Sequence, residues 1–412
     1  MPILGNTAGQ AGKASESATI TSVTAGSGSV SVAFNEPTYK GKGSVTYIAT
    51  SSPGGLTATG TSPITVTGLS NGTAYTFTIT VTTADGVSTL SSASSSATPV
   101  IPQAGYLMGG YTVSGGLRRS FIQKIAFSND AVSTIAATFD LARSHAAGFA
   151  NSGTAGYQAG GVVAPGNHTR RVDKLNFAAD TVSNTVTNMS SGATAATSPA
   201  AMANSGTAGY IAGGDKTEGG VSYRTSIDKL TFSNDTISVL GATLSQMQMQ
   251  WSGSANSGTA GYYAGGYNNG SPTGSTIVKL LFSNETRSNL STTLGVNNIT
   301  LNASHANSGT ASYWLGGFDS SITGAIQKLP FSTETRSTLG VTITARDYLS
   351  GFSKSGTAGY TLGGTQRNAS YMGQNTVDII DKISYSNDTV SSAGSLISAV
   401  YLASGCANSG VL

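Results

Sequence analysis

The amino-acid sequence predicts an all-β protein with a small N-terminal module and a larger, repeated C-terminal one. Val, Ile and Thr alternate with polar residues in short runs, which is the pattern of strands with one buried face. The 54 glycines, with abundant Ser, Thr and Asn, separate these runs as turn residues do. The 17 Tyr and 12 Phe are spread along the chain and can form a core, so we expect a folded protein rather than a disordered one.

Composition excludes several classes of protein. Charged residues make up 9% of the 412 residues, the net charge is +3, and no basic cluster exceeds Arg118-Arg119 or Arg170-Arg171, so we expect no nucleic-acid binding. Cys406 is the single cysteine, so the sequence predicts no internal disulfide, and three histidines do not complete a structural zinc site with it. No apolar run is long enough to span a bilayer, and we expect no membrane insertion.

The N-terminal part divides into an arm and a domain. Residues 1–15 are rich in Gly, Ala and Ser and have no periodicity, so we expect a flexible arm or an attachment peptide. Residues 16–99 contain alternating runs at 29–34, at 45–49 and from residue 64, and these runs predict half-buried strands.

Three short motifs indicate the type of this domain. They are Val-Thr-Gly-Leu-Ser-Asn-Gly-Thr-Ala-Tyr-Thr-Phe at 66–77, Ala-Asp-Gly-Val-Ser at 84–88 and the ending Ala-Thr-Pro at 97–99. With them the domain resembles a fibronectin type III domain, which implies a β-sandwich in which the Tyr75 hydroxyl bonds back to the backbone of the preceding turn. Phe34 stands where that family usually has Trp. No Arg-Gly-Asp is present, so we favour a spacer or docking module over a ligand-binding one.

An internal repeat defines the chain beyond a linker at residues 100–103. The pair Gly-Gly recurs at spacings of 51, 53, 52, 51 and 47 residues, beginning at Gly109, Gly160, Gly213, Gly265, Gly316 and Gly363. A phrase such as Asn-Ser-Gly-Thr-Ala-Gly-Tyr at 151–157 precedes the later pairs, and a second phrase such as Ile-Asp-Lys-Leu-Thr-Phe-Ser-Asn-Asp-Thr at 227–236 follows a variable connection. Residues 104–412 are therefore predicted to hold six copies of about 50 residues, each with four short strands.

Each copy has a fixed order of marker residues. Tyr stands three residues before each Gly-Gly, and Arg143 and Arg346 each precede their pair by 17 residues. This order resembles the kelch repeat, which often carries Arg at that place. Ser, as at Ser238, stands near the position of the usual Trp. The resemblance implies a six-bladed β-propeller of a divergent kelch subtype.

The two ends of the repeated part complement one another. The first copy begins at Ala104 without the Asn-Ser-Gly phrase, and residues 406–410, Cys-Ala-Asn-Ser-Gly, supply that phrase at the C-terminus. We therefore expect the C-terminal strand to complete the first blade and to close the propeller without an open sheet edge.

Recurrent side chains are expected at defined places. The Gly-Gly pairs allow a close approach of strands or a positive φ. One tyrosine in each copy is expected to pack between adjacent blades: Tyr106, Tyr157, Tyr210, Tyr262, Tyr313 and Tyr360. One lysine in each copy could belong to a basic ring for an anionic polysaccharide, but we favour solvated lysines on outer strands that protect the edges: Lys124, Lys174, Lys229, Lys279, Lys328 and Lys382.

No set of residues predicts catalysis. His145, His168 and His305 occur in different contexts without ligand-like spacing, and we expect each of them at the surface or in packing. Cys406 is expected to be a small buried residue of the closing strand. The chain has neither the Asp-box run of a propeller sialidase nor the paired histidines of a propeller copper oxidase. We therefore expect a non-enzymatic protein without a cofactor or a metal.

The connections after the Gly-Gly pairs differ most among the copies and are the expected binding surface. In a propeller they share one face, where aromatic and amide side chains suit stacking on sugars and hydrogen bonding to hydroxyls. The aromatic residues on them are Tyr111, Tyr223, Tyr267, Phe318 and Tyr371. The same side chains could instead serve contacts between subunits.

The N-terminus lacks the basic start and apolar stretch of a secretory signal, and the initiating Met1 argues against a cleaved one. Together with the repeats, this is similar to phage virion proteins with kelch-type repeats. We therefore expect a tail- or capsid-associated protein on the virion surface, present in several copies and docked to other virion proteins through residues 1–15 and the fibronectin-like module. The propeller would bind a host glycan or receptor. A bacterial surface adhesin of the same architecture is the alternative, and a glycan-active propeller enzyme is a less favoured one.

Overall fold

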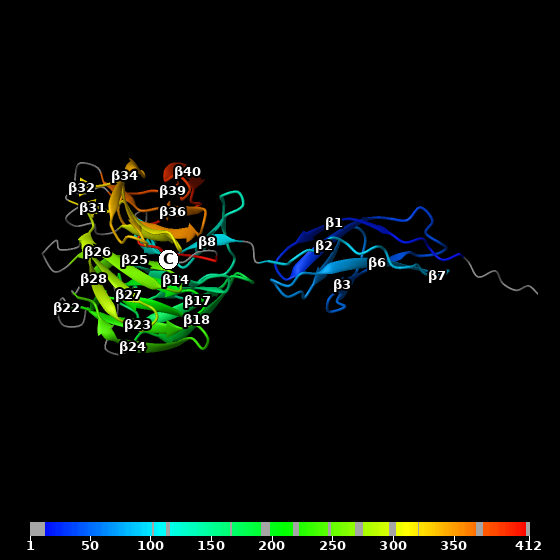
Figure 1. Ribbon diagram of the computed structural model, residues 1–412, viewed down its shortest axis with the longest axis horizontal. Helices are drawn as coiled ribbons and strands as arrows, with labels where there is room; N and C mark the ends of the chain where they lie inside the picture. The colour runs from blue at the N-terminus through cyan, green and yellow to red at the C-terminus, as the bar shows by residue number, and fades with distance from the viewer. Residues whose placement is uncertain are drawn as a thin grey trace, which may run out of the picture. The chain divides into compact units, whose positions relative to one another are not determined.

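The computed structural model describes residues 13–100, 103–112, 116–164, 167–190, 198–216, 222–245, 249–267, 275–295, 302–319, 321–367 and 374–408. Across these residues the protein is all-β, as the sequence predicts, and no helix among them is long and apolar enough to cross a membrane. The chain divides into two compact units, Met1–Pro102 and Gln103–Leu412, which Figure 1 colours from blue to cyan and from cyan to red. We call them unit 1 and unit 2.

Unit 1 consists of two antiparallel sheets around one core. The first sheet has the order β1 (Thr19–Ala25), β2 (Ser29–Asn35), β5 (Ile64–Thr67). The second has the order β4 (Thr57–Thr59), β3 (Thr46–Ser52), β6 (Thr76–Thr83), β7 (Gly86–Val87). Apolar residues alternate with Ser and Thr along β2 and β6, so each strand buries one row of side chains, including Val32, Phe34, Phe77 and Ile79, in the shared core.

Two local features fix the edges of unit 1. The N–H of Ser70 donates to the Tyr75 hydroxyl at 3.0 Å, as expected from the sequence. Ser88, Ser91 and Ser94 run beside β6, and each hydroxyl accepts an N–H of that strand at 2.8–3.0 Å. The three serines therefore satisfy backbone N–H groups of β6 that do not pair with the short strand β7.

Unit 2 contains six four-stranded antiparallel sheets among its described residues, and we number them in chain order. Sheet 1 has the order β41 (Ser404–Ala407), β8 (Ala104–Met108), β11 (Ile122–Ala126), β12 (Ala131–Thr134). Sheet 2 has β14 (Ala147–Asn151), β15 (Ala155–Ala159), β17 (Arg171–Asn176), β18 (Thr181–Asn188). Sheet 3 has β19 (Ala200–Asn204), β20 (Ala208–Ala212), β23 (Ser226–Thr231), β24 (Thr236–Thr243).

The remaining three sheets repeat this order. Sheet 4 has β25 (Met249–Asn256), β26 (Ala260–Tyr267), β27 (Thr276–Leu281), β28 (Arg287–Thr293). Sheet 5 has β29 (Ala303–Asn307), β30 (Ala311–Leu315), β33 (Ala325–Pro330), β34 (Ser337–Thr342). Sheet 6 has β35 (Ser350–Lys354), β36 (Ala358–Leu362), β39 (Ile379–Ser384), β40 (Thr389–Ser395).

The first strands of the six sheets lie against one another. β14 contacts β19, β19 contacts β25, β25 contacts β29 and β29 contacts β35, while β41 contacts both β35 and β14. β41 comes from the C-terminus and pairs with β8 from the start of unit 2, so that Cys406 lies opposite Tyr106. The first sheet is therefore built from both ends of unit 2.

The Gly-Gly pair directly follows the second strand of five sheets, and in sheet 4 it lies near the end of β26. All twelve of these glycines have a positive φ, between 59° and 106°, which side chains rarely tolerate. At Gly109 an added Cβ would also lie 2.7 Å from the Arg143 carbonyl oxygen. The pair thus needs glycine both for its backbone conformation and, at Gly109, for the approach of the connection that leads into the next sheet.

The Asn-Ser-Gly phrase links successive sheets at the far end of the first strands. The Asn side-chain oxygen accepts the N–H of the phrase glycine of the following sheet at 2.8–2.9 Å, in the pairs Asn151–Gly206, Asn204–Gly258, Asn256–Gly309 and Asn307–Gly356. In these four copies the phrase therefore recurs because its Asn supplies an acceptor for the following sheet.

A second link joins each sheet to the next through a buried tyrosine and a half-buried lysine. The hydroxyl donates at 2.6–3.3 Å and the ammonium at 2.5–2.7 Å to one carboxylate, which lies in the turn before the fourth strand of the following sheet. The sets are Tyr106, Lys124 and Asp180; Tyr157, Lys174 and Asp235; Tyr210, Lys229 and Glu285; Tyr262, Lys279 and Glu334; Tyr313, Lys328 and Asp388; and Tyr360, Lys382 and Asp130. We call each set an inter-sheet triad.

The triads confirm the predicted place of the tyrosines and correct that of the lysines. Each tyrosine ring stacks on an aromatic ring of the following sheet at 5.0–5.3 Å, as Tyr157 does on Phe232. The lysines lie on third strands, between two hydrogen-bonded neighbours, rather than on outer strands. Because each lysine pairs with a carboxylate, the six form neither a free basic ring nor a solvated edge.

Candidate functional site

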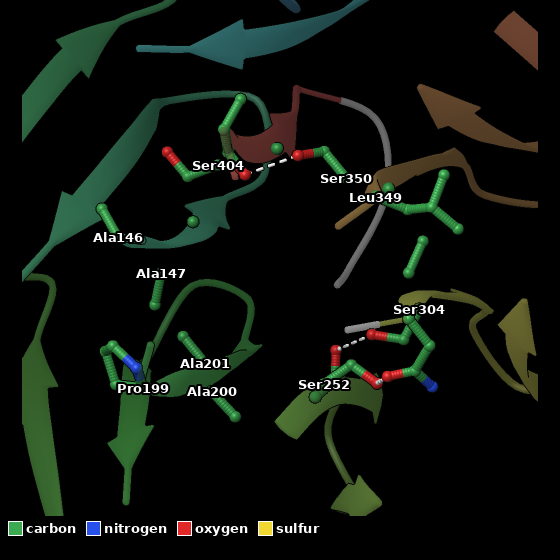
Figure 2. Close-up of a pocket in the computed structure, with 17 residues that line it drawn as sticks. Ala146, Ala147, Pro199, Ala200, Ala201, Ser252, Ser304, Leu349, Ser350 and Ser404 are labelled. Carbon is green, nitrogen blue, oxygen red and sulfur yellow. Dashed lines mark hydrogen bonds between the residues drawn. The ribbon is translucent and has the colours of Figure 1, made fainter. Parts of the chain in front are cut away.

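The first strands of unit 2 surround a cavity of about 100 Å³. Every one of the six strands contributes to its lining, mostly with Ala, Gly and Ser, and Figure 2 shows Ala147, Ala201, Ser252, Ser304 and Ser350 around it. Glycines keep the strands close, since a Cβ added to Gly148 would lie 2.3 Å from the Gly405 carbonyl oxygen. The cavity is thus narrow, well below the ~300 Å³ of a small ligand pocket.

Four residues with left-handed backbone conformation border one end of this cavity. They are His145, Ser198, Tyr348 and Leu402, with φ between 52° and 58°. Each directly precedes a lining residue: Ala146, Pro199, Leu349 or Ala403. Backbone hydrogen bonds of 2.8–3.1 Å join them in series, from the Ser198 N–H to His145, from His145 to Leu402 and from Leu402 to Tyr348. We call these four residues the rim.

A left-handed conformation costs energy for residues other than glycine, and it persists where the surroundings impose it. Such strain is concentrated at binding and catalytic sites. The hydrogen-bonded series explains how the rim is held, because the N–H groups of Ser198, His145 and Leu402 each donate to the carbonyl of the next residue in the series. The rim is therefore the best-defined candidate for a functional surface in unit 2.

Three tyrosines lie at one side of the rim. The Tyr401 ring is 5.4 Å from that of Tyr111 at an interplanar angle of 76°, and 5.7 Å from that of Tyr348 at 63°. Tyr111 and Tyr401 also exchange two backbone hydrogen bonds of 2.9 and 3.1 Å, which fix their separation. All three side chains are half-buried. We call Tyr111, Tyr348 and Tyr401 the tyrosine cluster.

Arg118 adds a positive charge to this cluster. It ends β10 (Leu117–Arg118), which pairs with β9 (Tyr111–Thr112), and its guanidinium lies 5.7 Å from the centre of the Tyr111 ring. Within the described part of the chain, Arg118 forms no ion pair with a carboxylate, and its Nε is buried without a hydrogen-bond partner. Such a guanidinium retains its capacity to bind an anion.

The charge of Arg118 affects the pKa of neighbouring ionisable groups. Burial, together with the charges of Arg118 and His168, lowers the pKa of His145 to about 4, so His145 is neutral at pH 7. Burial, with a contribution from Arg118, also lowers the pKa of His168, against the opposing effect of Asp215. Burial, with the neighbouring Tyr111 and Tyr348, raises the pKa of Tyr401 to about 12, so its hydroxyl remains protonated.

The described members of the predicted aromatic set belong to different sheets or to the connections beside them. Tyr111 belongs to the tyrosine cluster, and Phe318 begins β31 (Phe318–Asp319) with its side chain half-buried. Tyr223 ends β22 (Ser222–Tyr223), opposite Asp215, and Tyr267 ends β26, opposite Met249. Tyr371 lies outside the described residues. The structure thus joins one of the five predicted residues, Tyr111, to a defined cluster.

Tyr348 and Tyr401 are not among the residues predicted from the sequence, and they lie on the connections that lead into first strands. Comparison of equivalent positions in the copies would have indicated Tyr401. The backbone contact between Tyr111 and Tyr401 in sheet 1 corresponds to Val162 with Ser144 in sheet 2 and to Thr365 with Asp347 in sheet 6. The tyrosine pair therefore departs from the residues found at the same place in those two sheets.

Other buried polar groups have packing roles. Arg143 is fully buried and donates to Gln158 at 2.7 Å and to the Asp173 carboxylate, and Arg346 makes the corresponding pair with Asp381. His305 is fully buried, and burial lowers its pKa to about 3. Cys406 is buried as expected, and burial raises the pKa of its thiol. Among the described residues, no group of three or more His, Cys, Asp or Glu could hold a metal ion.

The geometry of the site thus combines a rigid rim, a half-buried aromatic cluster and a cation without a carboxylate partner in the described part of the chain. The sequence matches no family model and no curated protein.

Proposed function

We propose that residues 104–412 form a six-bladed kelch-type propeller closed by β41, and that residues 16–99 form a fibronectin-type-III-like sandwich. Six successive four-stranded sheets support the first proposal, as do the triads that link each sheet to the next, including Lys382 of sheet 6 to Asp130 of sheet 1. The sheet orders β1-β2-β5 and β4-β3-β6-β7 and the hydrogen bond to Tyr75 support the second.

On this architecture, the protein is a non-enzymatic structural and adhesion protein of a phage virion. One observation supports this proposal most directly. The repeated sheets present a distinctive cluster on connections that vary among the copies, and it consists of Tyr111, Tyr348, Tyr401 and Arg118. Binding residues are commonly placed on variable loops held by a rigid scaffold. The cavity beside the cluster is lined by Ala, Gly, Ser, Asn, Pro and Leu, a lining that suits packing better than proton transfer.

Unit 1 would connect the propeller to the particle. The paired sheets of unit 1 and the residues that precede them suit a docking module for other virion proteins, and several copies would be arranged by the symmetry of the particle. The propeller would then face the host surface, where it binds a glycan or a receptor. A bacterial surface adhesin with the same two units is the alternative.

Immunogold electron microscopy of particles and cells from the source culture tests the proposal, with an antibody raised against residues 104–412. We expect gold on particles, at the tail if the protein recognises the host and over the head if it decorates the capsid. Gold on cell envelopes with unlabelled particles would overturn the virion assignment in favour of the adhesin.

A further inference from the structure

We propose that Arg118 and the tyrosine cluster form a binding site for a saccharide that carries a carboxylate. This inference rests on the proposed glycan-binding function and specifies both the class of sugar and the residues that recognise it. The site would hold the sugar ring against tyrosine side chains while the guanidinium binds the carboxylate.

The cations of unit 2 differ in whether they pair with a carboxylate. The six triad lysines each pair with a carboxylate, and so do the buried Arg143 and Arg346. Arg118 and its neighbour Arg119 form no such pair among the described residues, and the Nε of each is buried without a hydrogen-bond partner. The positive charge beside the cluster is therefore not neutralised within the described protein. A planar guanidinium binds a carboxylate through two parallel hydrogen bonds, so a carboxylate is the group this position suits best.

The tyrosine cluster differs from the triad tyrosines in burial and in ring geometry. The six triad tyrosines are at most 1% exposed, and their rings stack on aromatic rings of the following sheet at interplanar angles of 12–24°. The rings of the tyrosine cluster are half-buried and meet at 63° and 76° instead. Tyr111 and Tyr401 are half-buried where the triad tyrosines are buried, so part of each of these two side chains can contact a ligand. A tyrosine offers an apolar face and a polar hydroxyl, which matches the mixed surface of a sugar ring.

The site is also rigid before any ligand binds. Two backbone hydrogen bonds join Tyr111 to Tyr401, and a third joins the Leu402 N–H to the Tyr348 carbonyl at 3.1 Å. The short pairing of β9 with β10 places Arg118 opposite Tyr111. A preformed site loses less conformational entropy on binding, which offsets part of the cost of holding a small polar ligand.

Matched pairs of saccharides test the inference on the full chain. The probes are sialyllactose with lactose, and polygalacturonate with its methyl ester, measured by titration calorimetry at physiological ionic strength. We expect the acidic member of at least one pair to bind at least about tenfold more tightly than its neutral partner, because a hydrogen-bonded charge contributes about this much. Arg118→Gln should remove that preference, and Tyr111→Leu should weaken both members of the pair.

Arg287→Gln serves as the matched control. Arg287 lies at the start of the fourth strand of sheet 4, where its guanidinium donates to the Asn289 side chain at 3.1 Å. This variant should bind as the wild type does, and unchanged thermal melting of all variants should exclude unfolding. Equal losses in Arg118→Gln and Arg287→Gln would indicate non-specific attraction by charge and would overturn the inference.

Two further outcomes separate this inference from the function on which it rests. Binding of neutral and acidic members alike, unaffected by Arg118→Gln, would overturn the acidic site and leave glycan binding by the propeller in place. Failure of the wild type to bind any saccharide of a broad panel would overturn both the site and the proposed glycan binding.

Discussion

The hydroxyl of Ser254, on the first strand of sheet 4, donates a hydrogen bond of 2.6 Å to that of Ser312, on the second strand of sheet 5. The other five junctions place a larger side chain against a glycine at these two positions. They are Cys406 over Gly156, Phe149 over Gly209, Met202 over Gly261, His305 over Gly359 and Phe352 over Gly105, and a Cβ added to any of these glycines would lie within 2.4 Å of that side chain. Neighbouring sheets therefore fit together by complementary volume.

This complementarity predicts a large effect of a small substitution at Gly359. A Cβ there would lie 2.0 Å from the His305 ring, and both residues are buried. We expect Gly359→Ser to lower the free energy of unfolding by about 1–3 kcal/mol, because well-packed cores do not admit extra atoms without strain. Chemical denaturation measures this loss, and Gly340→Ser is the control, since nothing lies within 4 Å of a Cβ added to that exposed glycine.

The double variant His305→Ser/Gly359→Ser would reproduce the pair of Ser254 and Ser312 at another junction. We expect it to be more stable than Gly359→Ser alone, because the smaller side chain vacates the space that the new serine needs. A double variant that is as unstable as the sum of its single substitutions would contradict a coupling between these two positions.

A second prediction concerns the inter-sheet triad of Asp235. Its carboxylate accepts hydrogen bonds from Tyr157 at 2.8 Å and from Lys174 at 2.7 Å, and its φ is 53°. Because the ion pair is partly exposed, we expect Asp235→Ala to cost about 1–2 kcal/mol of unfolding free energy. Asp235→Asn should cost less, since Asn tolerates this backbone conformation and still accepts a hydrogen bond.

Asp140→Ala is the matched control for this measurement. Asp140 also forms an ion pair, with Arg171, but its side chain is 54% exposed. An exposed pair contributes little, so this variant should stay within about 0.5 kcal/mol of the wild type. Equal stability of Asp140→Ala and Asp235→Ala would mean that the triads do not hold the sheets together.

The same triads predict a loss of stability at alkaline pH. Burial and the adjacent carboxylate raise the pKa of each triad tyrosine well above its ordinary value of 10. The folded state thus keeps protons that the unfolded state loses above pH ~10, so stability is intact below that pH and falls as pH rises beyond it. Each such tyrosine should contribute a slope of about 1.4 kcal/mol per pH unit.

Tyrosinate absorbance and circular dichroism, recorded together during an alkaline titration, check this expectation. Ionisation of the buried tyrosines should coincide with loss of the sheet signal. Ionisation of all 17 tyrosines near pH ~10 with the sheet signal intact would contradict it.

Much of unit 2 could be predicted because its sequence repeats. One Tyr and one Gly-Gly in every copy, and an Asn-Ser-Gly phrase in most copies, indicate positions that the sheets fill alike. The carboxylate partners of the lysines could not be predicted, although one acidic residue also recurs in each copy. Lys174 and Asp235, for example, lie in different copies, so their contact depends on how the sheets pack. The rim could not be predicted for a similar reason, since its four left-handed residues are all of different types: His145, Ser198, Tyr348 and Leu402.

The volume pairs between sheets show the same limit. Ser312 interrupts a series of glycines, but this exception has a reason only once Ser254 is known to face it. For His305 the sequence predicts a place at the surface or in packing, but only the structure shows that its ring occupies the space above Gly359 and that its Nδ1 lies 2.9 Å from the Tyr385 hydroxyl. Packing between distant segments, rather than local propensity, determines these residues.

This placement of His305 leads to a prediction about acidic pH. Burial lowers its pKa to about 3, below the ordinary value of 6.5, so the folded state disfavours the proton that the unfolded state accepts. The stabilising effect of the neutral ring is complete above pH ~6.5 and is lost as pH falls towards the folded pKa. His305→Met places at this junction the residue type that Met202 provides above Gly261. Between pH ~7 and ~5 the free energy of unfolding of the wild type should fall by about 2 kcal/mol more than that of His305→Met, because the variant lacks this titration and shares all others. Denaturant unfolding of the two proteins at both pH values measures this difference, and parallel pH dependences would show that His305 is not held neutral by burial.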